Sequence, residues 1–176
     1  MTARHPGGEA AALRLVEMAG ITPPCRLIDL GAGAGGTVRL LRSLGFEALG
    51  IDLLPGEGVE RGDVLAPPFP PGSFDAALCE CAFFLSGDPE RALREAARLL
   101  RPGGALLFSD VCPGGEVWLR RAASEAGFRV GAVEDATDEW KRYYISALWR
   151  GEAEYPPEGA KNCRYLHAVL RKEDTA

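Results

Sequence analysis

Short apolar runs alternate along the chain with segments in which apolar residues recur every three or four positions. The runs are rich in strand-forming residues, whereas the recurring positions mark the buried stripe of a helix. Strands that are followed in turn by helices predict an α/β fold with a parallel sheet. The expected strands are 25–30, 47–51, 59–63, 74–79, 105–111, 128–134 and 164–171. The expected helices are 8–20, a segment after residue 36, a segment after residue 88, 116–126 and the segment around 140–148.

Proline and glycine mark where these elements begin and end. Residues 66–72 include four prolines, which remove backbone donors and restrict their neighbours, so a loop is expected. Asp88 followed by Pro89 is typical of a helix start. Pro102 and the two glycines after it are expected to stop that helix.

A glycine-rich turn follows the first predicted strand. Glycine permits positive φ angles and a close approach of a ligand, and the helix that follows presents free N–H groups, which favours a cofactor with an adenosine moiety. Gly31, Gly33 and Gly36 fit the dinucleotide spacing, while Gly31, Gly33 and Gly35 fit a tighter one. Nicotinamide cofactors and S-adenosylmethionine (SAM) both stay open, because Asp52 would hold ribose hydroxyls in either case.

Length and composition narrow the class of protein. At 176 residues and 47% hydrophobic content, the chain is long enough for one well-buried domain and short for two. We expect a single domain over 1–176, with its core over about 8–171. The net charge of -5 provides no basic face for nucleic acid, and no apolar run is long enough for a membrane helix. Without the apolar core of a signal peptide, the expected location is cytoplasmic, and the five cysteines are expected to be reduced thiols.

Five segments stand in a characteristic order along the chain: LIDLGAGAG at 27–35, GID at 50–52, GD at 62–63, FPPGSFD at 69–75 and LLRPGGALL at 99–107. Together they resemble the class I SAM-dependent methyltransferases, especially the compact group with the ubiquinone and menaquinone-biosynthesis C-methyltransferases. Asp29 resembles the acid that ends the first strand in this class, whereas a nicotinamide site normally has an apolar residue there. The resemblance therefore implies SAM as cofactor and S-adenosylhomocysteine (SAH) as product.

The same resemblance implies a fold and a cofactor site. The fold is a Rossmann-like α/β sheet of seven strands in the order 3-2-1-4-5-7-6, mostly parallel with an antiparallel last strand, and with helices on both faces. In the site, Asp29 would support the ammonium group of SAM. The other contacts would come from Gly31, Ala32, Gly33 and Gly35 to the methionine part, Asp52 to the ribose, Leu53, Asp63 and Val64 to the adenine, and Cys79 through its backbone.

Methyl transfer requires a nucleophile in line with the sulfonium methyl, so much of the catalysis can come from orientation and exclusion of water. Glu80 and Asp110 are the candidate bases, because both follow strands whose carboxyl ends border the ligand crevice of an open α/β sheet. A carboxylate that caps a loop is the alternative for Asp110. The acceptor is expected to be a small molecule. Shortly after the fourth strand the quinone enzymes often carry a histidine pair, whereas this chain has Phe83, Phe84 and Leu85, so their substrate is not carried over.

Three cysteines follow the fourth and fifth strands and could face one crevice: Cys79, Cys81 and Cys112. Soft ligands suit soft centres, so SAM-dependent methylation of a trivalent arsenic species is an alternative function. Free cysteine is commonly a small buried hydrophobe, and no resident metal is predicted. Cys81, Phe83 and Cys112 are candidates for substrate contact, and Tyr143 is a candidate for a lid.

Two further alternatives remain at this point. A nicotinamide-dependent reductase would use the same glycine turn, and a non-catalytic SAM-binding accessory protein would keep the whole cofactor site. His167 is expected to be structural inside the last strand, and His5 lies in a terminus that is expected to be disordered. The acceptor atom and the oligomeric state are not specified by the sequence.

Overall fold

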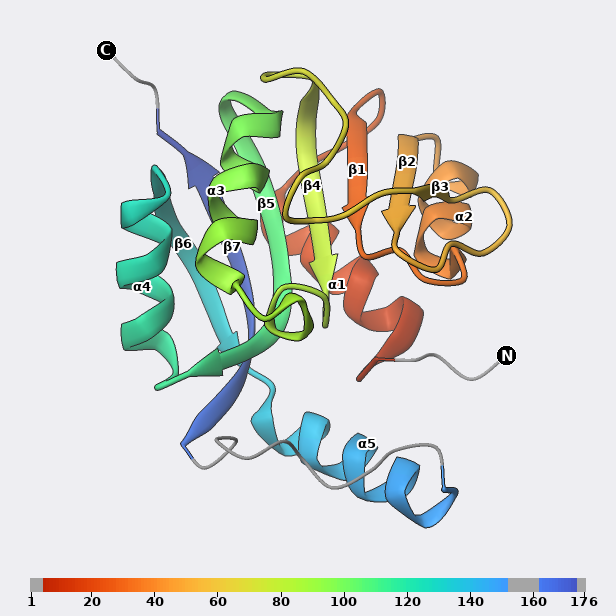
Figure 1. Cartoon of the computed structure of the whole chain (residues 1–176), viewed down its shortest axis with the longest axis vertical. Coiled ribbons are helices and arrows are strands. Elements are labelled where there is room, and N and C mark those ends of the chain that lie inside the picture. Colours follow the sequence, from red (N-terminus) through yellow and green to blue (C-terminus); the bar gives the residue numbers. More distant parts are fainter. Residues whose placement is uncertain (1–4, 152–161, 174–176) are drawn as a thin grey trace.

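The computed structural model describes residues 5–151 and 162–173, and their seven strands form one sheet (Figure 1). Residues 1–4, 152–161 and 174–176 of the predicted domain lie outside the described part. The strands are β1 Arg26–Leu30, β2 Glu47–Asp52, β3 Glu60–Arg61, β4 Phe74–Glu80, β5 Leu100–Pro113, β6 Phe128–Asp135 and β7 Cys163–Lys172. The helices are α1 Gly8–Ala19, α2 Gly36–Ser43, α3 Pro89–Leu99, α4 Glu116–Glu125 and α5 Thr137–Trp149, and η1 Phe84–Ser86 is a 3-10 turn.

The strand order in the sheet is β3-β2-β1-β4-β5-β7-β6. β1 pairs in parallel with β2 and β4, and β4 pairs in parallel with β5. β7 runs antiparallel to both of its neighbours, β5 and β6. The predicted order and the reversed last strand are therefore confirmed.

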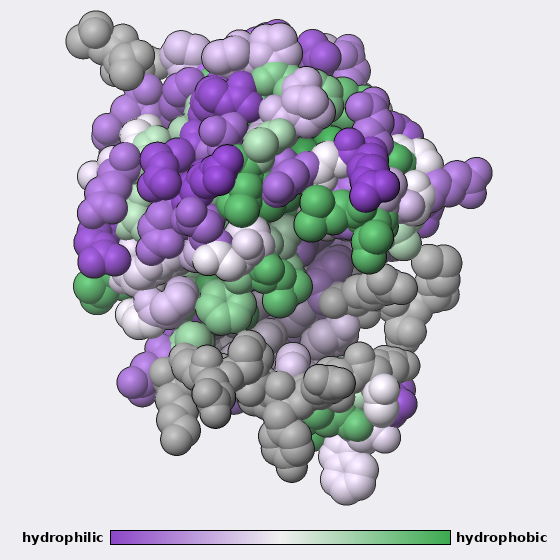
Figure 2. Space-filling view, viewed as in Figure 1, coloured by the Kyte–Doolittle hydropathy of each residue, from purple (hydrophilic) through white to green (hydrophobic). Residues whose placement is uncertain are grey.

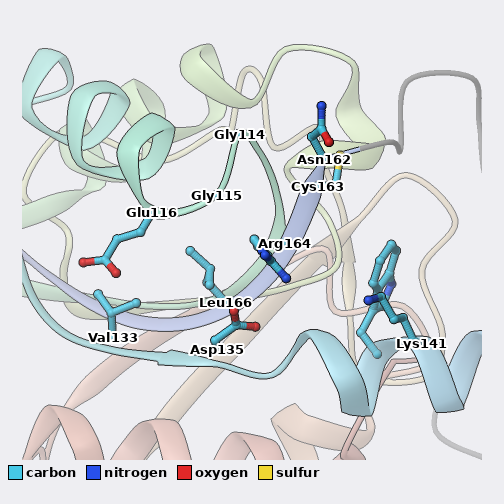
Figure 3. Close-up of a pocket in the computed structure, with 11 residues that line it drawn as sticks. Gly114, Gly115, Glu116, Val133, Asp135, Lys141, Asn162, Cys163, Arg164 and Leu166 are labelled. Carbon is cyan, nitrogen blue, oxygen red and sulfur yellow. The ribbon is translucent and has the colours of Figure 1, made fainter.

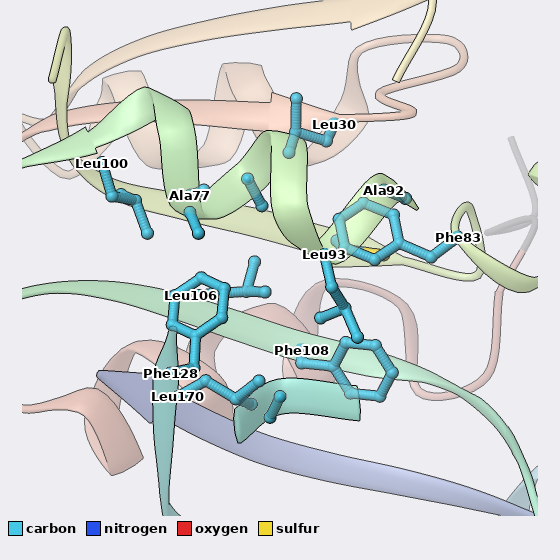
Figure 4. Packing of buried hydrophobic residues seen from close by; sticks show 14 of the residues in the cluster. Leu30, Ala77, Phe83, Ala92, Leu93, Leu100, Leu106, Phe108, Phe128 and Leu170 are labelled. Carbon is cyan, nitrogen blue, oxygen red and sulfur yellow. The ribbon is translucent and has the colours of Figure 1, made fainter. Parts of the chain in front are cut away.

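The sheet buries one apolar layer on each face. Side chains alternate between the faces along a strand, so Ile28 and Leu30 lie in one layer and Leu27 in the other. The larger layer packs under α3 and α4, where the rings of Phe83 and Phe108 meet edge to face at 6.2 Å (Figure 4). The smaller layer packs under α1 and α2. Helices on both faces are thus confirmed.

The boundary between α3 and β5 differs from the prediction. The helix begins as expected, with the Asp88 side chain accepting the amide N–H of Arg91. It ends three residues before Pro102, because Leu100 already has extended backbone angles and pairs with Phe74. A register shift in the β4–β5 pairing then accommodates the proline and its two glycines inside the strand.

The carboxyl ends of β1, β2, β4, β5 and β6 lie at one edge of the sheet, because these strands are parallel to one another. Figure 1 shows α5 below this edge, reached directly from β6, and the start of α1 near it. In open α/β sheets, ligands lie outside this edge.

The surface in Figure 2 is hydrophilic over much of the visible face, with hydrophobic residues in patches among the polar ones. Several large apolar side chains are exposed, including those of Leu53, Leu54 and Trp149. None of the helices in the described part of the chain is long and apolar enough to cross a bilayer.

Candidate functional site

The glycine turn is held against the end of β2 by hydrogen bonds. The amide nitrogens of Gly31 and Ala32 both donate to the carbonyl oxygen of Ile51, at 2.9 Å each. The amide nitrogen of Gly33 donates to Oδ2 of Asp52 at 2.8 Å. The structure therefore brings the predicted glycine turn and the predicted ribose carboxylate into direct contact.

Three glycines of this turn have positive φ angles, and each meets different surroundings. At Gly31, with φ of 93°, a Cβ would lie 2.3 Å from the Cβ of Ala82 in the loop after β4. At Gly33, with φ of 51°, a Cβ would meet nothing within 4 Å. Gly35, with φ of 74°, directly precedes α2. Gly31 is thus needed for packing, whereas the backbone at Gly33 is open to a ligand.

Two carboxylates are buried at the ends of β1 and β4. Asp29 is 2% exposed and Glu80 is 8% exposed. The hydroxyl of Thr37 donates to Oε2 of Glu80 at 2.9 Å, while Oε1 of Glu80 has no hydrogen-bond partner in the described part of the chain. Nδ1 of His5 lies 3.5 Å from Oε1 without forming a hydrogen bond. Glu80 is therefore held by one oxygen and leaves the other available.

The electrostatics of these carboxylates favour a positively charged ligand. Burial raises the pKa of Asp29 well above its usual range, and the negative charges of Glu80 and Asp52 raise it further. Burial also raises the pKa of Glu80, although His5 and the Thr37 hydroxyl act in the opposite direction. A cation bound here would favour the ionised carboxylates and relieve their mutual repulsion.

The remaining residues predicted for the nucleoside lie after β2 and β3. Asp52 accepts the amide N–H of Leu54 at 2.8 Å through its second oxygen. Leu53 is 60% exposed beside it and Val64 is buried in the larger apolar layer. Asp63 is exposed and accepts the amide N–H two residues later, at 2.8 Å. The adenine contacts of Leu53, Asp63 and Val64 stay predictions.

Asp110, the other candidate base, has both of its oxygens engaged. Oδ2 accepts the amide N–H groups of Phe83 at 2.8 Å and Phe84 at 3.2 Å, and the thiol of Cys79 at 3.5 Å. Oδ1 accepts the amide N–H of Val111 at 2.7 Å. Burial raises the pKa of Asp110 to about 6, and these donors limit the increase. The geometry favours the loop-capping alternative, in which Asp110 fastens the loop after β4 to β5.

The three predicted thiols do not converge on one crevice. Cys79 and Cys112 are fully buried in the larger apolar layer, whereas Cys81 packs with a separate cluster around Tyr165. Burial raises the pKa of all three thiols, which disfavours the thiolate. Within the described residues, no group of three His, Cys, Asp or Glu side chains is arranged to hold a metal ion. The metalloid alternative is therefore not favoured.

Two residues predicted to contact the substrate have their side chains in the core. Phe83 is fully buried against Phe108, and Cys112 is fully buried in the same layer. Such burial disfavours contact with a substrate, and the contacts of Phe83 and Cys112 stay predictions. Tyr143 is half-buried on α5 at that edge, and its contact with a substrate stays a prediction.

A polar cluster around Tyr165 was not anticipated. The Tyr165 hydroxyl lies 2.8 Å from Oγ of Ser109 and 3.1 Å from Sγ of Cys81, and its ring stacks on Trp140 at 6.2 Å. His5 was also missed, because its proximity to Glu80 depends on how the N-terminal segment crosses the sheet edge. A signal for Thr37 was present, since it stands in the first turn of the helix that follows the glycines.

Two cavities flank α5. The larger, of about 840 Å³, lies between α5, the start of β7 and the turn before α4. Figure 3 shows it with Gly114 and Gly115 at that turn, Arg164 on β7 and Lys141 on α5. The smaller, of about 370 Å³, lies between α1 and α5 and includes His167. Neither cavity is lined by the glycine turn itself.

Comparison with known proteins agrees with this geometry. Residues 28–108, which include the glycine turn, Asp52 and Glu80, match the family described as methyltransferase domain. Demethylmenaquinone methyltransferase from Thermus thermophilus is 35% identical over 117 residues, which are 57% of this chain and 53% of that protein. Residues 28–108 thus match a class I SAM-dependent methyltransferase domain. The nicotinamide alternative is thereby set aside.

Other matches of the methyltransferase domain differ in what they act on. Arsenite methyltransferase from Aquipseudomonas alcaligenes is 33% identical over 113 residues, which are 49% of this chain and 33% of that protein. A structural match is phosphoethanolamine N-methyltransferase 2 from Haemonchus contortus, solved with phosphomonomethylethanolamine and SAH. The match covers 97% of this chain and 54% of that protein's chain. Its TM-score is 0.76 at 18% identity, so this likeness concerns the fold. The chain spans about half, or less, of the length of these relatives.

Proposed function

We propose that this protein binds SAM at the glycine turn and transfers its methyl group to a small-molecule acceptor. The observation that carries the proposal is the buried pair Asp29 and Glu80, with Oε1 of Glu80 lacking a hydrogen-bond partner. A buried anion without its hydrogen bonds is costly, and a cationic ligand reduces that cost. SAM carries an ammonium and a sulfonium close together, so its charge fits this site.

The turn and Asp52 fit the rest of the cofactor. Each oxygen of Asp52 accepts one backbone N–H, from Gly33 and from Leu54. A carboxylate offers about four acceptor positions, so two remain for the ribose hydroxyls. The exposed side chain of Leu53 would provide an apolar surface for the adenine. The open backbone at Gly33 leaves room for the methionine part.

When bound, SAM supplies an electrophilic methyl group on its sulfonium. The chain contributes position and proton transfer. Asp110 is committed to its four donors, so we assign the role of base to Glu80, whose Oε1 is free to take a proton from the acceptor. Thr37 fixes the other oxygen of Glu80, and the raised pKa of this carboxyl makes it a stronger proton acceptor.

Calorimetric titration tests the cofactor site. We expect SAM and SAH to bind and NADH not to bind. Glu80→Gln is expected to lower the affinity for SAM by about tenfold or more, because a charge-assisted contact is lost. The affinity for SAH is expected to fall less, because its thioether is neutral. Glu125→Gln, at an exposed position on α4, is the matched control. Binding of NADH alone would contradict the proposal.

Incubation with methyl-labelled SAM and pools of small metabolites tests transfer. We expect the label to move to a small molecule and SAH to accumulate in equal amount. Tight binding of SAM with no transfer to any pool would instead support a non-catalytic accessory protein.

A further inference from the structure

The cavity between α1 and α5 contains a buried imidazole. His167 on β7 is 6% exposed, lines this cavity, and has an Nδ1 atom without a hydrogen-bond partner. Its ring meets that of Tyr165 edge to face at 5.8 Å. Burial lowers the pKa of His167, so the ring is neutral near pH 7 and can accept a hydrogen bond. A buried polar group of this kind usually has a partner, and here a ligand could supply it.

The strand register connects this imidazole with the carboxylate site. Glu80 on β4 stands opposite Ser109 on β5, which stands opposite His167 on β7, which stands opposite Glu134 on β6. Opposite residues point to the same face of a sheet, and neighbouring strands are about 4.8 Å apart. His167 is therefore about 10 Å from Glu80 along one continuous row of polar side chains.

Two members of this row, Glu80 and His167, carry unsatisfied buried atoms. Among the described residues, Oε1 of Glu80 and Nδ1 of His167 are the buried side-chain atoms without a hydrogen-bond partner. The N-terminal segment also joins the two places, since His5 lies 3.5 Å from Glu80 and Gly7 lines the cavity. The larger cavity, by contrast, is lined by neither unsatisfied atom.

The charge of the cavity selects a cation. Four carboxylates and two guanidinium groups line it: Glu134, Asp135, Asp138, Glu139, Arg14 and Arg142. The Arg14 guanidinium is already paired with Glu134 and with Glu17. The remaining carboxylates outnumber the remaining guanidinium group, so an anionic acceptor would be repelled. A volume of about 370 Å³ suits a molecule of small size.

We propose that this cavity is the acceptor site and that the acceptor is a small primary or secondary amine. The proposal rests on the proposed function, since it places the acceptor next to the methyl donor. The acidic side chains attract the ammonium form, and His167 accepts one N–H hydrogen bond from it as the amine enters the cavity. At the Glu80 end of the polar row the ammonium then gives a proton to Oε1 of Glu80, and the nitrogen lone pair forms the new N–C bond. The C–S bond breaks with its electron pair on sulfur, which leaves neutral SAH and a methylated ammonium.

Labelled SAM and matched probes test the class of acceptor. Butylamine and piperidine are compared with butanol and butyrate, which have similar size and a different functional group. We expect label on the amines at rates about tenfold or more above those on the other probes, because charge complementarity favours the cation. Equal transfer to butanol or butyrate would overturn the proposal.

Variants of the cavity test its location. Glu139→Gln on α5 is expected to raise the KM for butylamine about fivefold, with kcat nearly unchanged, because Glu139 attracts the amine without touching the cofactor. His167→Gln is expected to raise the KM as well, and Glu125→Gln on α4 is the control. An unchanged KM in both cavity variants would contradict the assignment.

Two measurements separate the failure of this inference from that of the proposed function. SAH affinity is measured by calorimetry for each variant, and normal SAH binding without amine transfer refutes the amine site alone. Absence of SAH binding in the unaltered protein refutes both proposals. In the SAH complex, butylamine is expected to produce a saturable NMR shift of the His167 ring, and an unmoved ring would refute the amine site even if transfer occurs elsewhere.

Discussion

Glu80 and Asp110 show how the same kind of buried group acquires different roles. Both are carboxylates at the ends of neighbouring strands, and burial raises the pKa of each. Asp110 accepts three backbone N–H groups and a thiol, so its charge stabilises a loop. Glu80 accepts one hydroxyl and leaves an oxygen unsatisfied, so its charge is available to a ligand.

Glu80→Gln is expected to stabilise the ligand-free protein, and more strongly at about pH 8 than at about pH 5. A carboxyl whose pKa rises on folding contributes its full stability below the unfolded pKa, and this contribution is lost as pH rises through the folded pKa. Glutamine avoids that loss and can still accept the Thr37 hydroxyl. Urea unfolding followed by circular dichroism at both pH values gives the two midpoints. A difference that shrinks as pH rises would contradict the burial argument.

Asp110→Asn is expected to have the opposite effect and to lower the free energy of unfolding by about 1–3 kcal/mol. An amide has one acceptor oxygen, so its NH₂ group would face backbone N–H donors of Val111 or of Phe83 and Phe84. The same urea titration measures this change in the free energy of unfolding, with Glu125→Gln as the surface control. Unchanged stability would mean that the loop after β4 does not depend on this carboxylate.

Among the elements, the turn between β1 and α2 combines packing with access. Gly31 faces Ala82 in the loop after β4, while Gly33 faces open space and donates its N–H to Asp52. The turn therefore joins the ends of three strands, β1, β2 and β4, and still exposes backbone to a ligand. Its two functions can be separated by substitution.

Gly31→Ala and Gly33→Ala are expected to differ in what they impair. Both place alanine at positive φ, which costs about 1–2 kcal/mol. Gly31→Ala adds a clash with Ala82, so it should lower stability by more than Gly33→Ala does. Gly33→Ala fills the open side of the turn, so SAH affinity should fall by more than its stability change implies. Thermal unfolding and calorimetry on both variants check this, and equal stability losses would contradict the packing role of Gly31.

The elements were predictable where the pattern is local. Apolar runs located the strands, and Asp88 with Pro89 located the start of α3, because these signals depend on neighbours in sequence. The start of β5 was missed because Leu100 becomes a strand residue only by pairing with Phe74. For the same reason the row from Glu80 to Glu134 was not foreseen, since it exists only in the register between four strands. Asp29 and Asp52 could be predicted as cofactor contacts because each directly adjoins a recognisable motif.

In the whole molecule, the strand order places the candidate site at the ends of β1 and β4, two neighbouring strands from which the chain continues toward opposite sides of the sheet. From β1 the sheet extends to β2 and β3 on one side, and to β4, β5, β7 and β6 on the other. The crevice outside the carboxyl ends of such strands is where ligands bind in α/β sheets. Asp29 is the second-last residue of β1, Glu80 ends β4, and α1 and α5 reach this edge from distant parts of the chain (Figure 1). The strand order of the sheet thus explains why distant residues meet at one site.

The docking of α1 on the far strands determines the sequence of events during synthesis. The guanidinium of Arg171 donates to the carbonyl oxygen of Ala19, and that of Arg14 pairs with Glu134. The partners in these two contacts are 152 and 120 residues apart in sequence, so the contacts can form only after β6 and β7 have been translated. Contacts between residues so far apart in sequence slow folding. The docking of α1 is therefore completed late, although β1, β4 and β5 already contribute to the apolar layer that it covers.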